Sequence, residues 1–357
     1  MAAIPYIPPS FGQPGVSISY RPKSLLPSTN PNNNINTTST TIHNNNSNND
    51  NNDTLTHPII PIITLEIPPA SIHGIFAHRQ WRAGMLLSDA LYSRAFSTSN
   101  LSILELGAGT GLPSITAALL GDASVVVASD YDEPSLVKQL RNNVTTNLAA
   151  AVGQGSKPKC KVVGHIWGKD AEELTDALPR GVTGFDRIFL ADCLWDPLSH
   201  QDLLKTIVKV LVTHEASRVN VIAGLHTGRD NVTSFIRRAY RVGLRLAHIE
   251  RPDLWPTLSS EAAGQADPDA QRPGNEALEH ATQRILELEV CGNTPIQVTT
   301  EPSSNGDNNQ AQRGHDEPRL TGITRPFLIE GYGAAIEGDV KLRNRWLTVW
   351  SLEWANL

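Results

Sequence analysis

Apolar residues in the middle of the chain follow two alternating patterns. Short apolar runs bounded by polar or turn-forming residues predict strands, at residues 102–106, 124–129, 161–166, 186–191 and 219–225. The segments between them carry apolar residues every three or four positions and predict helices, at residues 112–120, 134–148, 200–211 and 231–242, after a first helix in the second half of residues 71–95. Strands that alternate with helices of this length are typical of βαβ units and a parallel sheet.

The end of the chain has a different pattern. Apolar and polar residues alternate over residues 346–354, which predicts a half-buried strand. A strand reached after a long connection is expected to join one side of the parallel sheet in the antiparallel direction. Because βαβ crossovers are right-handed, helices should cover both faces of the sheet. The expected fold class is α/β, with a Rossmann-like, doubly wound, mostly parallel sheet and an antiparallel C-terminal strand.

Two polar stretches set the expected domain organisation. Residues 1–57 are rich in proline and then in asparagine, a composition that predicts a disordered tail. Residues 258–319 are poor in apolar residues and predict a low-complexity insertion with at most one helix, over residues 276–288. The folded core should therefore comprise residues 58–257, completed by strands within residues 320–357.

Charge and cysteine content narrow the function classes. The net charge is -6 and the pI is about 6.0, whereas proteins that coat nucleic acids usually present a basic domain. No apolar run approaches the ~18–20 residues of a membrane span, and the first residues lack the pattern of a secretory signal. Cys160, Cys193 and Cys291 are far apart, which suggests reduced thiols. We expect a cytoplasmic protein without a metal site and without direct nucleic-acid or membrane partners.

The strongest chemical signal is a glycine-rich turn between a strand and a helix. Gly107, Gly109 and Gly111 would let the backbone turn tightly and approach a ligand, with the amides at the helix start facing it. A dinucleotide-binding loop has its third glycine three residues after the second, but Leu112 occupies that position here. The tighter spacing favours a ligand without phosphates. Glu105, at the strand end, could accept a hydrogen bond from such a ligand directly or through water.

Asp130 follows the next strand and is the second part of this signal. A carboxylate at the tip of the neighbouring strand can accept hydrogen bonds from both hydroxyls of a ribose. The alternative is that Asp130 only caps a turn. Taken with the glycine loop, the acid points to an adenosine without phosphates, and S-adenosylmethionine is the common ligand of that description.

A series of motifs resembles a known enzyme family. The motifs are Trp81-Arg-Ala-Gly84, Glu105-Leu-Gly-Ala-Gly-Thr-Gly111, Ser129-Asp-Tyr131, Ile166-Trp-Gly168, Ala191-Asp-Cys-Leu-Trp195 and His226-Thr-Gly-Arg229. Together they resemble the class I, seven-stranded, S-adenosylmethionine-dependent methyltransferases of family 16. This group includes protein lysine methyltransferases, some of which modify a translation elongation factor, and nicotinamide N-methyltransferase-like proteins. The resemblance covers a little over half the chain and implies a seven-stranded sheet.

The resemblance also implies cofactor contacts. Carried over position by position, they fall on Trp81, Gly107, Ala108, Gly109, Asp130, Trp167 and Ala191, to which the glycine-loop argument adds Glu105 and Gly111. An indole face at Trp81 could lie near the methionine end, because aromatic faces attract a cation such as a sulfonium. Trp167 could flank the adenine. For each tryptophan the alternative is packing in the core.

Asp192 and Trp195 are the candidate catalytic residues. They follow the fourth predicted strand, at the sheet edge where open α/β sheets bind ligands. The related lysine methyltransferases carry Asp-x-x-Tyr or Asp-x-x-Phe here, so Trp195 keeps an aromatic wall but has no hydroxyl. The alternative is that Asp192 caps a helix and Trp195 packs. His200 and His226 could act as bases, but a single histidine is more often structural, and we assign neither a role.

These features predict an S-adenosyl-L-methionine-dependent N-methyltransferase. The acceptor expected from the resemblance is a protein amine, on lysine or at an N-terminus, for example on a translation factor. One alternative is a small-molecule acceptor such as nicotinamide, whose pyridine nitrogen is already neutral. A second alternative is a non-catalytic scaffold that retains the cofactor fold.

Overall fold

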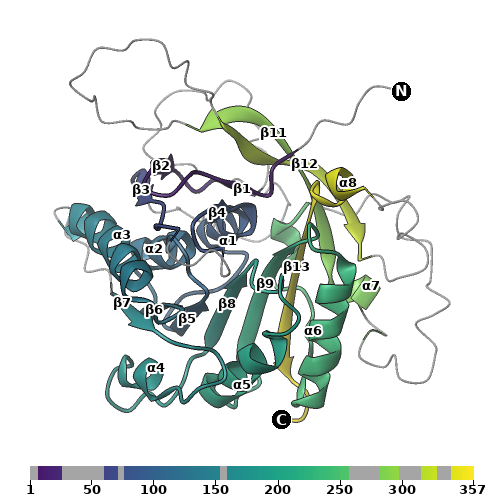
Figure 1. Ribbon diagram of the computed structural model, residues 1–357. Coiled ribbons are helices and arrows are strands. Elements are labelled where there is room, and N and C mark those ends of the chain that lie inside the picture. Colours follow the sequence, from purple (N-terminus) through teal and green to yellow (C-terminus); the bar gives the residue numbers. More distant parts are fainter. Residues whose placement is uncertain are drawn as a thin grey trace, which may run out of the picture.

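The computed structural model describes residues 7–25, 60–70, 76–152, 159–256, 278, 281–296, 315–327 and 339–357. These residues include a large mixed sheet and the helices packed against it (Figure 1). Its parallel part has the order β7 (Cys160–Gly164), β6 (Val125–Asp130), β5 (Ser102–Leu106), β8 (Arg187–Ala191), β9 (Arg218–Gly224). Each of these strands was predicted from a short apolar run, and the structure confirms them with bounds shifted by at most two residues.

The C-terminal strand extends the sheet beyond β9. β13 (Trp346–Trp354) pairs antiparallel with β9, which confirms the predicted direction. β11 (Leu286–Ile296) pairs with the other side of β13, and β12 (His315–Pro326) pairs with β11. β10 (Leu244–Leu246) pairs with the end of β13. The run from β7 to β11 contains the seven strands that the resemblance implies, and β10 and β12 add to it.

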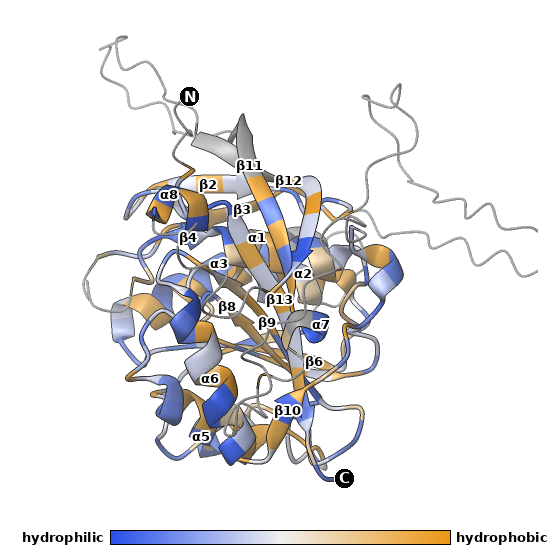
Figure 2. Cartoon of the chain, turned by 90° about the vertical axis from the view of Figure 1, so that its right-hand side faces the viewer, coloured by the Kyte–Doolittle hydropathy of each residue, from blue (hydrophilic) through white to orange (hydrophobic). Residues whose placement is uncertain are grey.

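Helices cover both faces of the sheet, as predicted. The helices of the two faces contribute to separate apolar clusters: α1 (Arg82–Tyr92), α2 (Leu112–Leu120) and α3 (Pro134–Val152) on one face, and α4 (Glu172–Asp176), α5 (His200–Val210) and α6 (Arg229–Arg241) on the other. Figure 2 shows mainly hydrophobic central strands and mixed colouring along α5 and α6. The short elements are η2 (Pro252–Leu254), α7 (Ala281–Arg284) and α8 (Val340–Arg343). No helix among the described residues is long and apolar enough to cross a membrane.

The N-terminal region is a correction to the predicted organisation. Within residues 1–57, which were expected to be disordered, residues 7–25 form two strands: β1 (Ser10–Phe11) pairs with β4 (Gln80–Trp81), and β2 (Ser17–Tyr20) pairs with β3 (Ile63–Glu66). Phe11, Ile18 and Tyr20 are buried. The prediction was wrong because these strands are short, lie between prolines, and depend on partners more than 40 residues away. The asparagine-rich part lies outside the described residues.

The predicted insertion is also corrected. Residues 286–288, expected to end a helix, begin β11, and residues 315–319 begin β12. Leu286, Leu288 and Val290 are buried and alternate with Glu287 and Glu289, which are buried as well. The acids made this segment look solvent-exposed, but arginine side chains bind them in the fold. Most of the remaining insertion lies outside the described residues.

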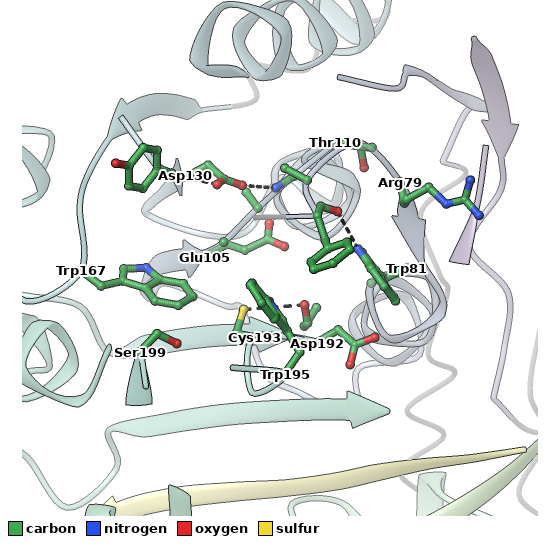
Figure 3. Close-up of a pocket in the computed structure, with 18 of the residues that line it drawn as sticks. Arg79, Trp81, Glu105, Thr110, Asp130, Trp167, Asp192, Cys193, Trp195 and Ser199 are labelled. Carbon is green, nitrogen blue, oxygen red and sulfur yellow. Dashed lines mark hydrogen bonds between the residues drawn. The ribbon is translucent and has the colours of Figure 1, made fainter. Parts of the chain in front are cut away.

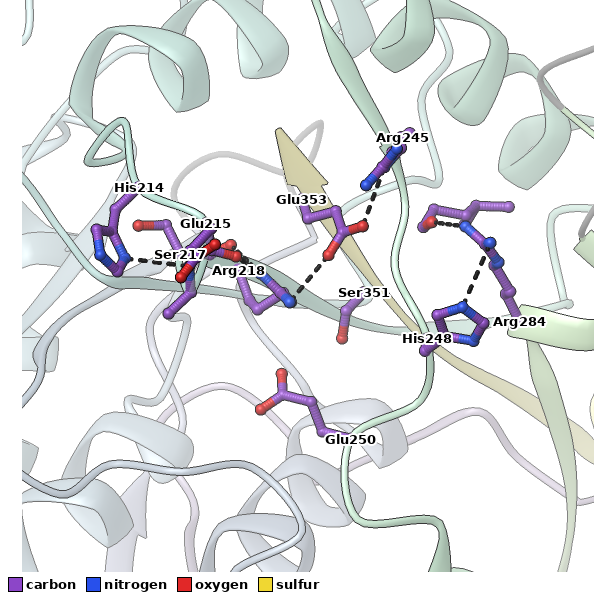
Figure 4. A network of polar contacts seen from close by, with 12 residues as sticks. His214, Glu215, Ser217, Arg218, Arg245, His248, Glu250, Arg284, Ser351 and Glu353 are labelled. Carbon is purple, nitrogen blue, oxygen red and sulfur yellow. Dashed lines mark hydrogen bonds and ion pairs between the residues drawn. The ribbon is translucent and has the colours of Figure 1, made fainter. Parts of the chain in front are cut away.

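A polar network connects β9, β10 and β13 at the edge of the sheet where the parallel strand β9 begins (Figure 4). Glu353 on β13 binds Arg218 on β9 at 2.9 Å and Arg245 on β10 at 3.0 Å. Asn220 donates to Ser351 at 2.9 Å and to Glu250 at 2.9 Å. These contacts fix the register of β9, β10 and β13 at the end where β9 begins, so they have a structural role.

Candidate active site

A cavity of about 300 Å³ lies at the carboxyl ends of the parallel strands (Figure 3). The strand order reverses between β5 and β8, because β6 and β7 extend to one side and β9 to the other. Ligands of open α/β sheets bind at such a point, and the volume is in the range of small-molecule sites. The expected site residues that line the cavity are Trp81, Glu105, Gly107, Ala108, Gly109, Asp130, Trp167, Ala191, Asp192 and Trp195.

The glycine loop after β5 presents its backbone to this cavity. Gly107 has a φ of +71°, and a Cβ there would lie 2.9 Å from Cys193 Sγ and 3.3 Å from Trp167 Cζ2. Gly109 has a φ of +54°, and a Cβ there would have nothing within 4 Å. Both backbone conformations favour glycine. The loop therefore brings the tryptophan close at one position and leaves open space for a ligand at the next.

Gly111 differs from the other loop glycines. It does not line the cavity, which argues against the direct cofactor contact that we predicted for it. It precedes α2 with a φ of +84°, and a Cβ there would lie 2.6 Å from Leu140 Cδ1 on α3. This glycine is required for the turn and for the close packing of α2 against α3.

Asp130 is held in place at the end of β6. Its Oδ2 accepts a hydrogen bond from the Gly109 amide at 2.5 Å, and its Oδ1 accepts one from Tyr131 at 2.7 Å. Burial raises the pKa of this carboxyl, while the hydrogen bonds from Gly109 and Tyr131 oppose the rise. Each carboxylate oxygen has a second lone pair, so Asp130 can still accept hydrogen bonds from a ligand in the cavity.

Glu105 is the more deeply buried acid of the site, with an exposed fraction of 1%. Its Oε2 accepts hydrogen bonds from the Ser114 amide at 2.9 Å and from the Ser114 hydroxyl at 2.5 Å. Burial raises the pKa of Glu105 to about 8; the bonds from Ser114 lower it, and nearby Asp130 raises it further. At neutral pH Glu105 is therefore mostly uncharged. Its main observed contact ties the start of α2 to the end of β5.

The two tryptophans form walls of the cavity. Trp81 and Trp167 are both partly exposed, so neither is a fully buried core residue. The Trp81 indole donates from Nε1 to the Phe76 carbonyl at 3.1 Å, which fixes the plane of its ring. β1 pairs with Trp81 through Ser10, so the N-terminal segment also holds this residue.

Asp192 and Trp195 lie in the same cavity after β8. Asp192 has an exposed fraction of 8% and a φ of +60°, a conformation uncommon outside glycine and found at functional sites. Its Oδ1 accepts a hydrogen bond from the Gly224 amide at 2.9 Å. The residue that precedes α5 is Ser199, so Asp192 does not cap that helix. The Trp195 ring meets Phe76 edge-on at 5.2 Å.

Several lining residues were not predicted. The additional side chains include Phe76, Arg79, Thr110, Tyr131, His165, Cys193, Ser199 and Asp202. Phe76 belongs to a loop without hydrophobic periodicity, so no pattern in the sequence could identify it. Cys193 lies two positions after the end of β8, and its position beside Asp192 was an available but weak signal. Burial raises the pKa of the Cys193 thiol well above its usual range, so it is not a reactive thiolate.

His200 has a structural environment. Its Nε2 lies 3.1 Å from the Leu194 carbonyl, and its ring packs edge-on against Phe235 at 5.2 Å. Burial lowers the pKa of this imidazole. Among the described residues, no group of three or more His, Cys, Asp or Glu side chains could hold a metal ion.

The fold and the cavity define an α/β domain in which a glycine loop, acidic side chains and aromatic side chains surround one cavity at the carboxyl ends of the parallel strands. Residues 64–241 match the family model described as lysine methyltransferase, a range that includes every residue lining the cavity. The chain belongs to this family.

Fungal proteins described as "Protein N-terminal and lysine N-methyltransferase EFM7" are similar to the chain. A Cryptococcus neoformans relative is 35% identical over 141 residues, 40% of this chain and 45% of the relative. An Eremothecium gossypii relative is 31% identical over 195 residues, 54% of this chain and 72% of the relative. An Aspergillus fumigatus relative is 33% identical over 156 residues, 43% of this chain and 59% of the relative. The chain therefore spans about half the length of the first of these relatives.

Proposed function

We propose that the protein is an S-adenosyl-L-methionine-dependent N-methyltransferase that acts on a protein amine, on lysine or at an N-terminus. The observation that carries the proposal is the shared cavity, where the glycine loop with Asp130 and the Asp192–Trp195 pair line the same space. The names of the fungal relatives support a protein acceptor. A translation factor is one acceptor consistent with the resemblance.

The part of the cavity around the glycine loop and Asp130 fits the cofactor. The open backbone at Gly109 offers room for a nucleoside, and the remaining lone pairs of Asp130 suit ribose hydroxyls. Trp167 and Trp81 offer aromatic faces for the adenine and the positively charged sulfur. When bound, S-adenosylmethionine supplies a methyl group on a sulfonium. The protein's own contribution is to hold the acceptor nitrogen in line with that methyl group.

The part of the cavity lined by Asp192, Trp195 and Phe76, here called the acceptor compartment, fits an amine. Asp192 can accept a hydrogen bond from the amine, and Trp195 and Phe76 provide apolar walls beside it. A carboxylate alone favours the charged ammonium, whereas an apolar environment favours the neutral amine that can attack. Asp192 therefore orients the nitrogen, while the aromatic walls reduce the cost of losing its proton.

Asp130→Ala is expected to weaken S-adenosylmethionine binding by about 1.5–3 kcal/mol, the usual contribution of hydrogen bonds to a charged group. Isothermal titration calorimetry measures this directly. Because Asp130 also holds the Gly109 amide, Asp130→Asn serves as the matched variant that can keep this backbone contact. If both variants bind the cofactor as tightly as the wild type does, Asp130 only caps the turn.

Asp192→Asn and Trp195→Ala are expected to lower turnover on the order of a hundredfold, because they remove alignment of the acceptor. Cofactor affinity should change little. Trp195→Phe keeps an aromatic wall and should retain more activity than Trp195→Ala. Initial rates at saturating cofactor, with calorimetry on the same samples, measure both quantities. Wild-type turnover in both Asp192→Asn and Trp195→Ala would show that Asp192 and Trp195 do not position the acceptor.

The acceptor class is tested with tritiated S-adenosylmethionine and a cell lysate. After incubation with the protein, the lysate is separated into protein and small-molecule fractions. Label in the protein fraction is the expected result. Label confined to small molecules would indicate an acceptor such as nicotinamide, and failure to bind the cofactor would indicate a scaffold.

A further inference from the structure

His226 lies directly behind the acceptor compartment. It follows β9, and its imidazole stacks on the Trp81 indole with ring centroids 5.1 Å apart and planes inclined by 17°. The side chain is 13% exposed. Trp81 lines the large cavity and His226 does not, so the imidazole is in contact with a wall of the site and outside the space that a ligand would fill.

His226 also faces Asp192. Its Nδ1 lies 4.0 Å from Asp192 Oδ1, and this nitrogen is buried without a hydrogen-bond partner among the described residues. Gly224 makes the approach possible, since a Cβ there would lie 2.6 Å from His226 Nδ1 and 3.2 Å from Asp192 Oδ1. A larger residue at this position would separate the two groups.

Asp192 lies between the large cavity and the small cavity that His226 lines. It lines the large cavity, and it also lines a small second cavity together with His226 and Arg82. Arg82 on α1 is the other charged group that faces this small cavity; β13 and the segment before it contribute Asn344, Trp346 and Leu347, which are uncharged. Arg229, the first residue of α6 and three positions after His226, is bound to buried Glu287. The charged groups around the small cavity with His226 are therefore the Asp192 carboxylate and the Arg82 guanidinium.

We propose that His226 takes up, through Asp192, the proton that the acceptor ammonium must lose before methylation. This inference rests on the proposed function. The Asp192 oxygen and the His226 nitrogen are 4.0 Å apart, so a shift of about 1 Å brings them within the distance of a charge-assisted hydrogen bond once a proton lies between them. His226 is a positioning residue in this arrangement, since it acts on the acceptor only through Asp192.

The step balances in protons and electrons. The ammonium R–NH₃⁺ gives one proton to the Asp192–His226 pair and becomes R–NH₂. The nitrogen lone pair then forms the N–C bond to the methyl group, and the electrons of the broken C–S bond go to sulfur. The product is R–NH₂–CH₃⁺, and His226 passes its proton to solvent.

The pH dependence of His226→Phe tests this role. Phenylalanine keeps a ring on Trp81 but has no nitrogen. The rate of methyl transfer from tritiated S-adenosylmethionine into the protein fraction of a lysate is measured at saturating cofactor between pH 6 and 9.5. We expect a loss of about a hundredfold near pH 7, within the usual contribution of general acid–base catalysis, shrinking to a few-fold at pH 9.5, where solvent can deprotonate the amine. Cofactor affinity should stay within about twofold, because the stacking on Trp81 is retained.

A control and a second measurement separate the possible failures. His214→Phe, an exposed histidine at the opposite edge of the sheet (Figure 4), should keep the wild-type profile. His226→Phe combined with Asp192→Asn should lose no more activity near pH 7 than Asp192→Asn alone, because His226 acts only through Asp192. A loss in His226→Phe that is equal at every pH, or no loss at all, would overturn the proposal and show a packing role. If the wild type transfers no methyl group to any acceptor, the proposed function itself fails.

Discussion

Deletion of residues 1–27 is expected to destabilise the protein on the order of 5 kcal/mol, from three buried side chains worth about 1.5–3 kcal/mol each. Phe11, Ile18 and Leu25 are 1–6% exposed, and their removal uncovers apolar surface on β3 and α1. The deletion also removes the hydrogen bonds that Tyr20 and Lys23 make to Asp89 on α1. The total free energy of unfolding of a typical domain is only about 5–15 kcal/mol.

Thermal and urea unfolding measure this effect. A loss of this size corresponds to a fall in Tm of about 10–20 °C for a domain of this length. Deletion of residues 1–6 is the matched control, since none of the contacts just named involves them. An unchanged Tm in the longer deletion would show that the N-terminal strands contribute no net stability.

The fold was predictable where the signal is local. β5 and α2 begin and end at the predicted residues, because an apolar run, three glycines and a proline define them within about 20 positions. β2 and β11 were missed because their stability comes from partners far along the chain, such as β3 and β13. Glu287 shows the physical reason. A charged residue predicts a solvent-exposed position, but in the fold Glu287 is buried beside arginines from distant parts of the chain.

The site was predictable to a similar extent. Asp130 ends β6 and Asp192 follows β8, the two parallel strands on either side of β5, so their meeting at one edge follows from the topology alone. Phe76 and the Trp81–His226 stack could not be predicted, because they depend on how a loop before α1 folds over the sheet edge. Gly111 does not line the cavity, and the sequence could not show this, since a glycine required for helix packing and one required for ligand approach look alike in sequence.

Arg229→Met is expected to destabilise the protein by about 3–5 kcal/mol, the usual cost of breaking a buried ion pair from one side. Arg229 begins α6 and donates to both oxygens of Glu287, which is 0% exposed. Arg325 also binds Glu287, at 2.6 Å. Without Arg229, the Glu287 carboxylate remains buried but loses the positive charge and the hydrogen bonds that Arg229 provides. Chemical denaturation measures the loss.

Two further variants test whether burial is the cause. Arg229→Met combined with Glu287→Leu removes the uncompensated charge and should be more stable than Arg229→Met alone. Arg245→Met breaks the more exposed pair with Glu353 and should cost no more than about 1 kcal/mol. Equal losses for Arg229→Met and Arg245→Met would contradict the argument. A large and specific effect would explain the His226-Thr-Gly-Arg229 motif, because the buried pair anchors the loop that places His226 behind Asp192.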